Sequence, residues 1–584
     1  MTAPLALAMK ASGDARPASQ KLTERSLTLR PRRPAIPRAA LGAAAFAVTL
    51  ALPLLPAGPA FAQDAAATTA KETAPDFTPV LGQAQSFSFD VLTQRARDLA
   101  AAAYRTPVVE QPDVLEKIDY DAHWKIRFRP ETTVDVGDVP VQFFHLGTYF
   151  RNPVKISVVE NGSARQIQYD PRFFDMPKDS PARKLTKGTG FAGFRLMDPD
   201  LKTDWISFLG ASYFRTSGPF GQYGMSARGL AINSGMSTPE EFPLFTEFYI
   251  EKPKDGSADV TLYALMDSPS VAGAYRMDIT KGAPGQGQTM QISSKLFFRQ
   301  SVERLGIAPL TSMYWYSETN RVLAFDWRPE VHDADGLMMI MGNGEQVWRP
   351  LMNPPRVVTS SFMTENPKGF GLIQRDRRFE NYEDDGVFYD KRASVWIAPR
   401  EGWGKGQIQL VEIPTNDEVY DNIVTFWNPD QKPIAGQEMD FDYTLSWADQ
   451  PPVPETLAKT VSTRIGAGGV PGLPRPKDEL KVAIDFDGGQ IGTLGQNQGV
   501  TPVVSVPEGV KIVQSYALPV VGTSRWRLIF DIDAPGIETA DLRAYLEKDG
   551  QPLTETWLGQ VHPAQFDRAR PDYNPPDPQP ATTP

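Results

Sequence analysis

The chain has no cysteine among its 584 residues. A disulfide framework, a thiolate metal site and a cysteine nucleophile are therefore excluded. Only four histidines are present, which argues against a metal site built from several of them. The net charge of −10 argues against nucleic acid or an anionic membrane surface as a partner. We expect no metal, no organic cofactor and no nucleic acid.

Several familiar catalytic motifs are also missing. Residues 224–228 lack the second glycine of a nucleophile elbow, and the chain contains neither a H-E-x-x-H zinc motif nor a Walker lysine loop. Residues 333–336 begin like a calcium-binding loop, but the downstream ligands are absent. Residues 342–344 form a Gly-Asn-Gly sequence that predicts a hairpin turn. The remaining chemical candidates are carboxylates, arginines and aromatic residues in loops.

The N-terminal segment has the pattern of an export signal. Eight Lys or Arg residues within residues 1–38 precede an apolar run that starts at Ala39, and Ala60 and Ala62 mark a cleavage site before Gln63. The apolar run is too short and too rich in proline to be a transmembrane helix. Arg32-Arg33 leaves both the twin-arginine and the general export route open. We therefore predict a signal peptide over 1–62 and a mature protein in the periplasm.

The mature chain is predicted to be mainly β. A flexible N-terminus is predicted over 63–85, and Ser88 or Asp90 is predicted to begin a helix that runs to about Tyr104. Beyond the helix, short alternating runs separated by Gly, Pro and Asp predict a large β-sandwich over 86–450. The domains predicted after it are a Pro- and Gly-rich linker over 451–476, a small immunoglobulin-like β-sandwich over 477–565 and an irregular tail over 566–584.

Two loop clusters carry the densest acidic side chains. One spans 328–336 and contains His332, and the other spans 414–422. Glycoside hydrolysis requires a pair of carboxyl groups, one protonated as the general acid and one ionised as the base. The alternative interpretation is that these are solvated turn residues, since Asp and Asn dominate turns through local hydrogen bonds. Composition alone favours that alternative.

Nine stretches of the mature chain match a pattern known from another group of proteins. They lie at 190–195, 209–215, 223–232, 240–243, 263–268, 308–313, 342–345, 348–351 and 403–406. On these stretches the chain resembles the periplasmic glucan biosynthesis family, the G and D proteins of osmoregulated periplasmic glucan synthesis. The resemblance covers about Phe87 to Trp557, and residues 450–453 together with the extension beyond Trp557 are more similar to the D proteins.

The resemblance implies a fold and an activity. The fold is a large galactose-mutarotase-like β-sandwich followed by a small immunoglobulin-like one. Some similar members are β-1,2-glucanases that act on linear glucan with inversion, and some relatives are transglycosylases. On the family pattern Asp421 is the general acid and Asp333 is the general base. Glu418 matches a neighbouring acidic position, and Tyr389 and Arg392 match a loop on the substrate side.

Residues near the two predicted catalytic positions have other possible roles. Asp335 and Glu330 are the alternatives to Asp333 as the base, and His332 is expected to hold the loop rather than react. Trp348 and Trp403 are predicted to stack on glucose rings, although both are equally compatible with the core. We expect Arg228 to be a sheet-buried partner of a carboxylate.

Two functions follow from these observations. The first is a periplasmic glycoside hydrolase or transglycosylase that acts on linear or branched β-1,2-linked glucan and controls the glucose backbone during biosynthesis. The second is a non-catalytic glucan-binding or scaffold protein that assists a membrane glucosyltransferase. Family resemblance also suggests a homodimer. Fold class alone does not decide between these functions.

Overall fold

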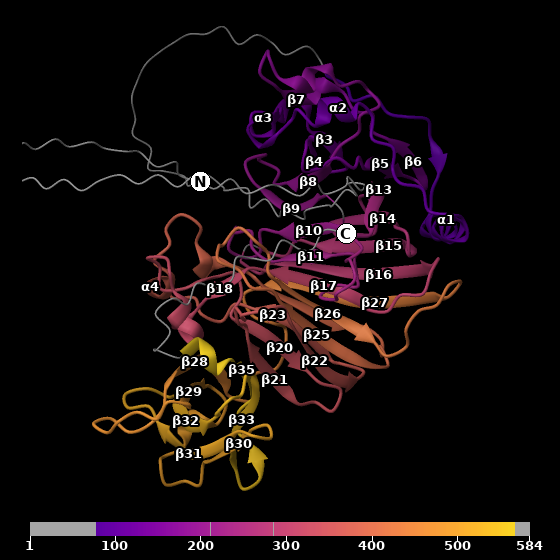
Figure 1. The fold of residues 1–584 in the computed structure, drawn as a ribbon. Helices are drawn as coiled ribbons and strands as arrows, with labels where there is room; N and C mark the ends of the chain where they lie inside the picture. Colours follow the sequence, from indigo (N-terminus) through magenta and orange to yellow (C-terminus); the bar gives the residue numbers. More distant parts are fainter. Residues whose placement is uncertain (1–76, 211, 284, 567–584) are drawn as a thin grey trace, which may run out of the picture. The chain divides into compact units, whose positions relative to one another are not determined.

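The computed structural model describes residues 77–210, 212–283 and 285–566 (Figure 1). The predicted signal peptide, most of the predicted flexible N-terminus and nearly all of the predicted tail lie outside these ranges. The described chain is mainly β, as the sequence predicts. Residues 77–85 are tied to the sheet, since the Gly82 amide donates to Gln166 and Phe77 packs on the core.

Two large sheets, which share one core, form the body of the described chain. Within the described ranges the first sheet follows the order β1 (Gln85–Ser86), β6 (Ser163–Gln166), β5 (Lys155–Glu160), β13 (Leu244–Glu251), β14 (Val260–Asp267), β15 (Val271–Thr280), β16 (Gln288–Phe298), β27 (Glu438–Ala448), β24 (Ser394–Pro399), β23 (Gly369–Ile373), β20 (Gly336–Ile340), β21 (Gln346–Pro350), β35 (Thr556–Val561), β33 (Ala540–Lys548) and β30 (Thr501–Ser505), with β34 (Gln551–Pro552) beside β33. The second sheet follows the order β22 (Val358–Glu365), β25 (Lys405–Glu412), β26 (Ile423–Pro429), β17 (Leu305–Ser312), β11 (Ser226–Arg228), β10 (Tyr213–Thr216), β9 (Asp204–Leu209), β8 (Gly193–Met197), β4 (Val139–Phe144) and β3 (Val134–Val136), with β12 (Leu230–Ile232) beside β17.

Alternation of side chains explains why these strands form two layers. Along β16 the side chains of Met290, Ile292 and Leu296 are buried, while Gln291 between them is exposed. Successive side chains of a strand point to opposite faces, so one face enters the core. The predicted Gly-Asn-Gly turn is confirmed, because β20 and β21 pair antiparallel around it and the Met341 amide donates to Glu345 across the turn.

Helix α1 (Phe89–Ala101) covers the outer face of the first sheet. Its N-cap is Ser88, whose side chain accepts a hydrogen bond from the Val91 amide, so one of the two predicted caps is confirmed. Leu92 and Ala96 are fully buried against aromatic side chains of β13 and β14. The helix therefore hides from water a sheet face that carries apolar residues.

The remaining elements are short. They are α2 (Pro112–Leu115), α3 (Tyr120–Trp124), α4 (Phe379–Tyr382), the paired strands β18 (Tyr314–Tyr316) and β19 (Val331–His332), the pair β2 (Arg127–Phe128) and β7 (Phe174–Asp175), and 3₁₀ turns that include η4 (Glu318–Leu323) and η5 (Tyr389–Lys391). In Figure 1, β18 and α4 lie on the same side of the large sheets. The loops that follow these two elements carry most of the candidate site.

A small C-terminal sandwich is present, and it begins earlier than the sequence suggests. The sheet order β28 (Lys459–Ala467), β29 (Glu479–Asp487), β32 (Trp526–Asp533) and β31 (Lys511–Pro519) makes one of its layers. Strand β28 lies inside the predicted linker, where the surrounding Pro and Gly residues conceal it. The other layer is β35, β33 and β30, which continues the first large sheet because β35 pairs parallel with β21.

We predict that Leu92→Ala lowers the free energy of unfolding by about 2–5 kcal/mol, because it leaves a cavity between α1 and the sheet. Val91→Ala, on the exposed side of the same helix, serves as the matched control and should change that energy by less than about 0.5 kcal/mol. Urea unfolding of the two variants measures the difference. Equal effects would show that α1 is not packed on the sheet through Leu92.

Candidate active site

Asp333 follows β19 directly and is buried. Its amide donates to the carbonyl of Met313, and its Oδ1 lies 2.9 Å from Nε of the buried Arg392. Burial raises the pKa of the Asp333 carboxyl above its usual range, while the positive charges of Arg392, His332 and Arg215 oppose that rise. A buried carboxylate with a cationic partner can act as a base, because the cation favours its ionised form.

Asp421 lies partly buried in the loop between β25 and β26. The next residue, Asn422, fixes this loop. Its Oδ1 accepts from the Tyr314 amide at 2.8 Å, and its Nδ2 donates to the carbonyls of Tyr314 and Ile413, each at 2.9 Å. The side chain of Asn422 thus satisfies the backbone N–H and C=O groups of Tyr314, as the backbone of a paired strand would do.

These contacts place Asp333 and Asp421 around one segment of chain. Asp333 bonds to Met313, and the neighbour of Asp421 bonds to Tyr314. The structure therefore brings together two acidic positions that are far apart in the sequence.

Tyr389, Arg392 and Glu418 complete the candidate site as one connected group. The Tyr389 hydroxyl donates to Glu418 Oε2 at 2.6 Å, and the guanidinium carbon of Arg392 lies 5.2 Å from the centre of the Tyr389 ring. Burial raises the pKa of the Tyr389 hydroxyl well above its ordinary value, and the charge of Glu418 adds to this. Tyr389 therefore remains a proton donor toward Glu418 at neutral pH.

Arg328 begins the acidic cluster 328–336, but no role for it is predicted from the sequence. This buried guanidinium donates from Nη1 to Asp384 Oδ2 and to Glu418 Oε2, both at 2.7 Å, and from Nε to Asp326 Oδ1 at 2.9 Å. Hydrogen bonds to these carboxylates raise the pKa of Arg328 still further above its usual value. Asp326 lies in the same loop as Arg328, but Asp384 and Glu418 lie 56 and 90 residues further along the chain, so local spacing could not have predicted these two contacts.

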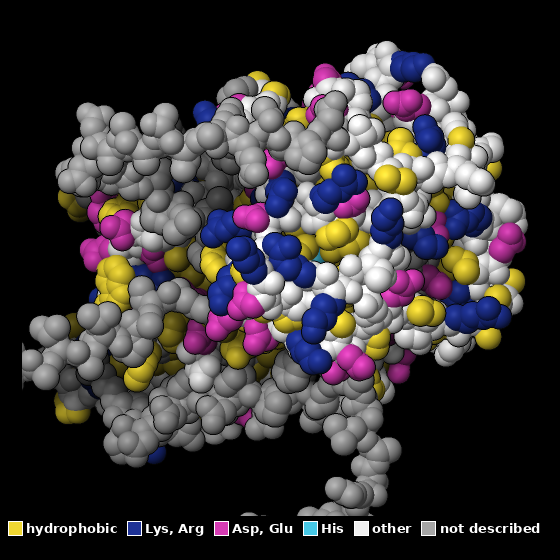
Figure 2. All heavy atoms as spheres, turned by 90° about the horizontal axis from the view of Figure 1, so that it is seen from above, with side chains coloured by type: hydrophobic (Ala, Val, Ile, Leu, Met, Phe, Trp, Pro, Cys, Tyr) yellow, Lys and Arg dark blue, Asp and Glu magenta, His cyan; other side chains and the backbone are white. Residues whose placement is uncertain are grey.

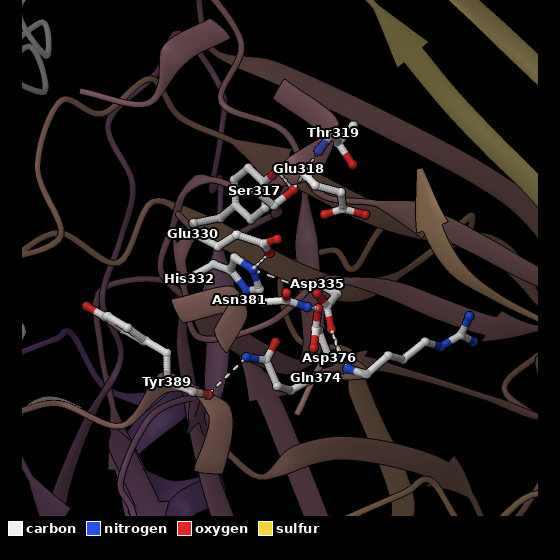
Figure 3. A network of polar contacts seen from close by, with 12 residues as sticks. Ser317, Glu318, Thr319, Glu330, His332, Asp335, Gln374, Asp376, Asn381 and Tyr389 are labelled. Carbon is white, nitrogen blue, oxygen red and sulfur yellow. Dashed lines mark hydrogen bonds and ion pairs between the residues drawn. The ribbon is translucent and has the colours of Figure 1, made fainter. Parts of the chain in front are cut away.

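A second network of polar contacts surrounds His332, the residue that precedes Asp333 in the chain (Figure 3). His332 Nε2 is 3.1 Å from Glu330 Oε2 and 3.8 Å from Asp335 Oδ1. Burial lowers the His332 pKa, but its hydrogen bond to Glu330 and the charges of Asp335 and Glu318 outweigh this and raise it to about 9. Burial raises the pKa of Asp335 to about 6 and that of Glu318 to about 8.

Both alternatives to Asp333 as the base, Asp335 and Glu330, belong to this network. Asp335 Oδ2 accepts from the amides of Arg375 and Asp376, and Glu330 is bound to His332. Ligand atoms of Glu330, His332 and Asp335 lie within 4.8 Å of one another and could hold a metal ion. In this structure the same atoms already pair with one another. His332 therefore holds the loop, as the sequence predicts, and the expectation of no metal stays a prediction.

The structure does not bring Trp348 or Trp403 to the site. Trp348 is buried in the core of the C-terminal sandwich with the guanidinium carbon of Arg375 3.6 Å from the centre of its ring. Trp403 is buried against Trp427, Phe441 and Tyr443. Neither ring has a face open to a sugar in this structure, and residue type alone could not separate a core tryptophan from a binding one. Arg228 is buried and paired with Glu240 at 2.9 Å, as expected.

A separate cavity of about 750 Å³ lies beside α1 and β5. Its lining combines basic Arg95, Lys155 and Lys187 with acidic Glu110 and Glu247. The end of the protein that carries β7 and α2, seen from above in Figure 2, likewise shows Lys and Arg side chains with Asp and Glu side chains between them. Such mixed charge is unlike the single-signed surface that binds a polyanion. The cavity contains none of the predicted site residues.

Residues 87–561 match the family described as "Periplasmic glucan biosynthesis protein, MdoG". The chain belongs to this family. It is 48% identical over 500 residues to "Glucans biosynthesis protein D 2" of Ralstonia nicotianae, covering 83% of this chain and 92% of that one. It is 48% identical over 492 residues to "Glucans biosynthesis protein D" of Xanthomonas oryzae pv. oryzae, covering 83% and 91%.

Similarity to solved structures is weaker. The galactosidase domain of alpha-galactosidase-sucrose kinase matches 38% of this chain and 30% of its own at 10% identity. The TM-score of 0.22 is too low to indicate a shared fold. Within the described ranges, no helix is both long and apolar enough to cross a membrane. The family match and the two relatives confirm the resemblance that the sequence motifs indicate.

We predict that the His332 imidazole remains protonated until the pH approaches about 9, whereas His145 and His562, whose pKa values burial lowers to about 4, are neutral at pH 7. Because the folded-state pKa of His332 is raised, its contribution to stability is present below about pH 6.5 and is lost as the pH rises through about 9. Nitrogen chemical shifts of ¹⁵N-labelled histidines, assigned with His332→Gln, measure these states. A neutral His332 at pH 7 would contradict the ion pair with Glu330.

Proposed function

We propose that this protein is a periplasmic enzyme acting on β-1,2-glucan, an inverting glycoside hydrolase or a transglycosylase, which controls the glucose backbone of osmoregulated periplasmic glucans. The observation that supports this most is the placement of Asp333 and Asp421 around the segment of Met313 and Tyr314. Membership of the glucan biosynthesis family supports the choice of substrate. The export signal and the same family support a periplasmic location.

In this proposal the two carboxyl groups have different tasks. Asp421 gives its proton to the glycosidic oxygen that leaves, and Asp333 accepts a proton from water or from a sugar hydroxyl that attacks the anomeric carbon. Inverting enzymes separate these groups by about 6.5–9.5 Å to leave room for the attacking molecule.

The surrounding residues support these tasks. Arg392 favours the ionised state of the buried Asp333, as a base requires. The Tyr389 hydroxyl donates to Glu418, and the Tyr389 ring lies against the Arg392 guanidinium that pairs with Asp333, so contacts run from Asp333 through Arg392 and Tyr389 to Glu418. This chain of groups can orient a water or a sugar hydroxyl. We further propose linear or branched β-1,2-linked glucan, a membrane glucosyltransferase and a second copy of the chain as partners.

The second candidate is a non-catalytic glucan-binding or scaffold protein that assists a membrane glucosyltransferase. The cavity of about 750 Å³ beside α1 favours it, since this cavity offers a binding site without Asp333 or Asp421. Incubation of the mature protein with linear β-1,2-glucan decides between the two functions. Product size and anomeric form are followed over time at several pH values. Bound but unchanged glucan would favour the scaffold.

We predict that Asp421→Asn lowers the turnover of β-1,2-glucan by about 10²–10⁴-fold, at the upper end of that range, because the amide cannot deliver a proton to a poor leaving group. Asp333→Asn should cause a comparable loss, and the double variant should lose little more, since acid and base act as one unit. Glucan affinity should survive in each variant. Turnover, affinity and thermal stability are measured together.

Asp335→Asn is the matched control, since Asp335 lies two residues from Asp333 and contacts His332 and backbone amides instead of Arg392. Its effect on turnover should be milder than that of Asp333→Asn. If Asp421→Asn retains turnover within about tenfold of the parent, the acid assignment is wrong. A loss of activity that merely follows unfolding would make Asp421 a structural turn residue.

A further inference from the structure

Several large apolar side chains near the candidate site are exposed. Phe325 is 88% exposed and Trp327 is 70% exposed, both in the loop between η4 and β19. Val419 and Tyr420, in the loop between β25 and β26, are also exposed. A large apolar side chain gains free energy when a ligand covers it, so four of them near a candidate site are candidates for ligand contact.

Contacts of Arg328 show that these side chains come from neighbouring loops. Trp327 lies between Asp326 and Arg328 in the chain, and Val419 and Tyr420 directly follow Glu418. Arg328 binds both Asp326 and Glu418. The two loops are thus fastened to one guanidinium, and the exposed residues flank the contacts that fasten them.

A third loop is fixed to the same guanidinium. Asp384 Oδ2 accepts from Arg328 Nη1, while its Oδ1 accepts from the amides of Gly386 and Val387 at 2.9 and 2.7 Å. The loops are therefore held by ion pairs to the buried Arg328 and by backbone hydrogen bonds instead of by packing of their aromatic rings. Because the frame is fixed without them, the rings can be presented to a ligand without being ordered first, and this saves entropy on binding.

We propose that Trp327, with Phe325 and Tyr420 beside it, forms an aromatic platform on which a glucose ring of the substrate stacks next to Asp421, and that Arg328 and its carboxylates hold this platform in place. This inference rests on the proposed function, since it takes the glucan as the ligand. The apolar C–H face of a pyranose fits a flat ring, and tryptophan offers the largest one. Tyr420 directly precedes Asp421, so a sugar on the platform lies beside the candidate acid.

The test is the affinity of the mature protein for linear β-1,2-glucan, measured by calorimetry. Trp327→Ala should weaken binding by about tenfold, because a loss of this size is typical when one well-placed contact is removed. Trp327→Phe should restore most of the affinity, since a smaller ring still stacks. Trp124→Ala is the matched control, because Trp124 is an exposed tryptophan on α3, remote in sequence from Asp421. This control should bind the glucan like the parent.

A double-variant cycle tests the role of the ion pairs. Asp384→Ala removes one partner of Arg328 and should weaken binding in the parent, but it should add little to Trp327→Ala, because the platform is then already lost. Equal effects in both backgrounds would show that Asp384 acts independently of Trp327. Tryptophan emission gives a second readout, since the exposed Trp327 should shift to shorter wavelength when the glucan covers it.

The outcomes separate this inference from the proposed function. If the parent neither binds nor cleaves the glucan, both fail. If the parent binds and Trp327→Ala binds equally well, the platform is refuted and the proposed function stands. Sedimentation of each variant identifies the competing occupant of this surface, a second copy of the chain. If Trp327→Ala turns a dimer into a monomer and the monomer keeps its glucan affinity, the surface is an interface between copies.

Discussion

The geometry of the candidate site depends on the ion pairs of the Arg328 guanidinium. Its partners Asp326, Asp384 and Glu418 lie on three loops that are far apart in the sequence. A buried guanidinium is stable only when carboxylates and hydrogen bonds replace the water it has lost. Each of the three carboxylates is therefore held within hydrogen-bonding distance of Arg328. Glu418 in turn accepts from Tyr389, so the same constraint reaches the group around Asp333.

A second constraint acts on the backbone and explains why similar carboxyl groups have different environments. Asn422 bonds to both backbone groups of Tyr314, and the Asp333 amide bonds to the adjacent Met313. Asp333 then faces Arg392, while Asp335, two residues later, faces His332 and two backbone amides. Two neighbouring carboxyl groups thus have different partners, a guanidinium for Asp333 and an imidazole with backbone amides for Asp335.

The sequence predicted the regular parts of this structure and could not predict the parts made by distant contacts. Ser88 as a helix cap and the Gly-Asn-Gly turn at 342–344 are local signals, and both predictions are confirmed. Family motifs, rather than spacing, suggested Asp333, Tyr389, Arg392 and Glu418, which the structure brings together. Arg328 lies in the acidic cluster 328–336, but its ion pairs with Asp384 and Glu418 were not predicted, because an ion pair between loops leaves no periodic pattern. Trp348 and Trp403 were predicted to stack on glucose rings, because residue type alone does not distinguish a buried ring from an exposed one.

The change in composition near residue 450 is not a boundary in the packing. Strand β35 extends the large sheet beside β21, and Met338, Trp348 and Trp396 of the large sheet belong to the core of the C-terminal sandwich. The sandwich also reaches the candidate site, since the Thr463 amide donates to Glu318 and Arg375 bonds to Glu555. Glu318 raises the His332 pKa, and Arg375 donates its amide to Asp335. The C-terminal sandwich is therefore part of the support for the Asp333 loop, and the site is a property of both domains.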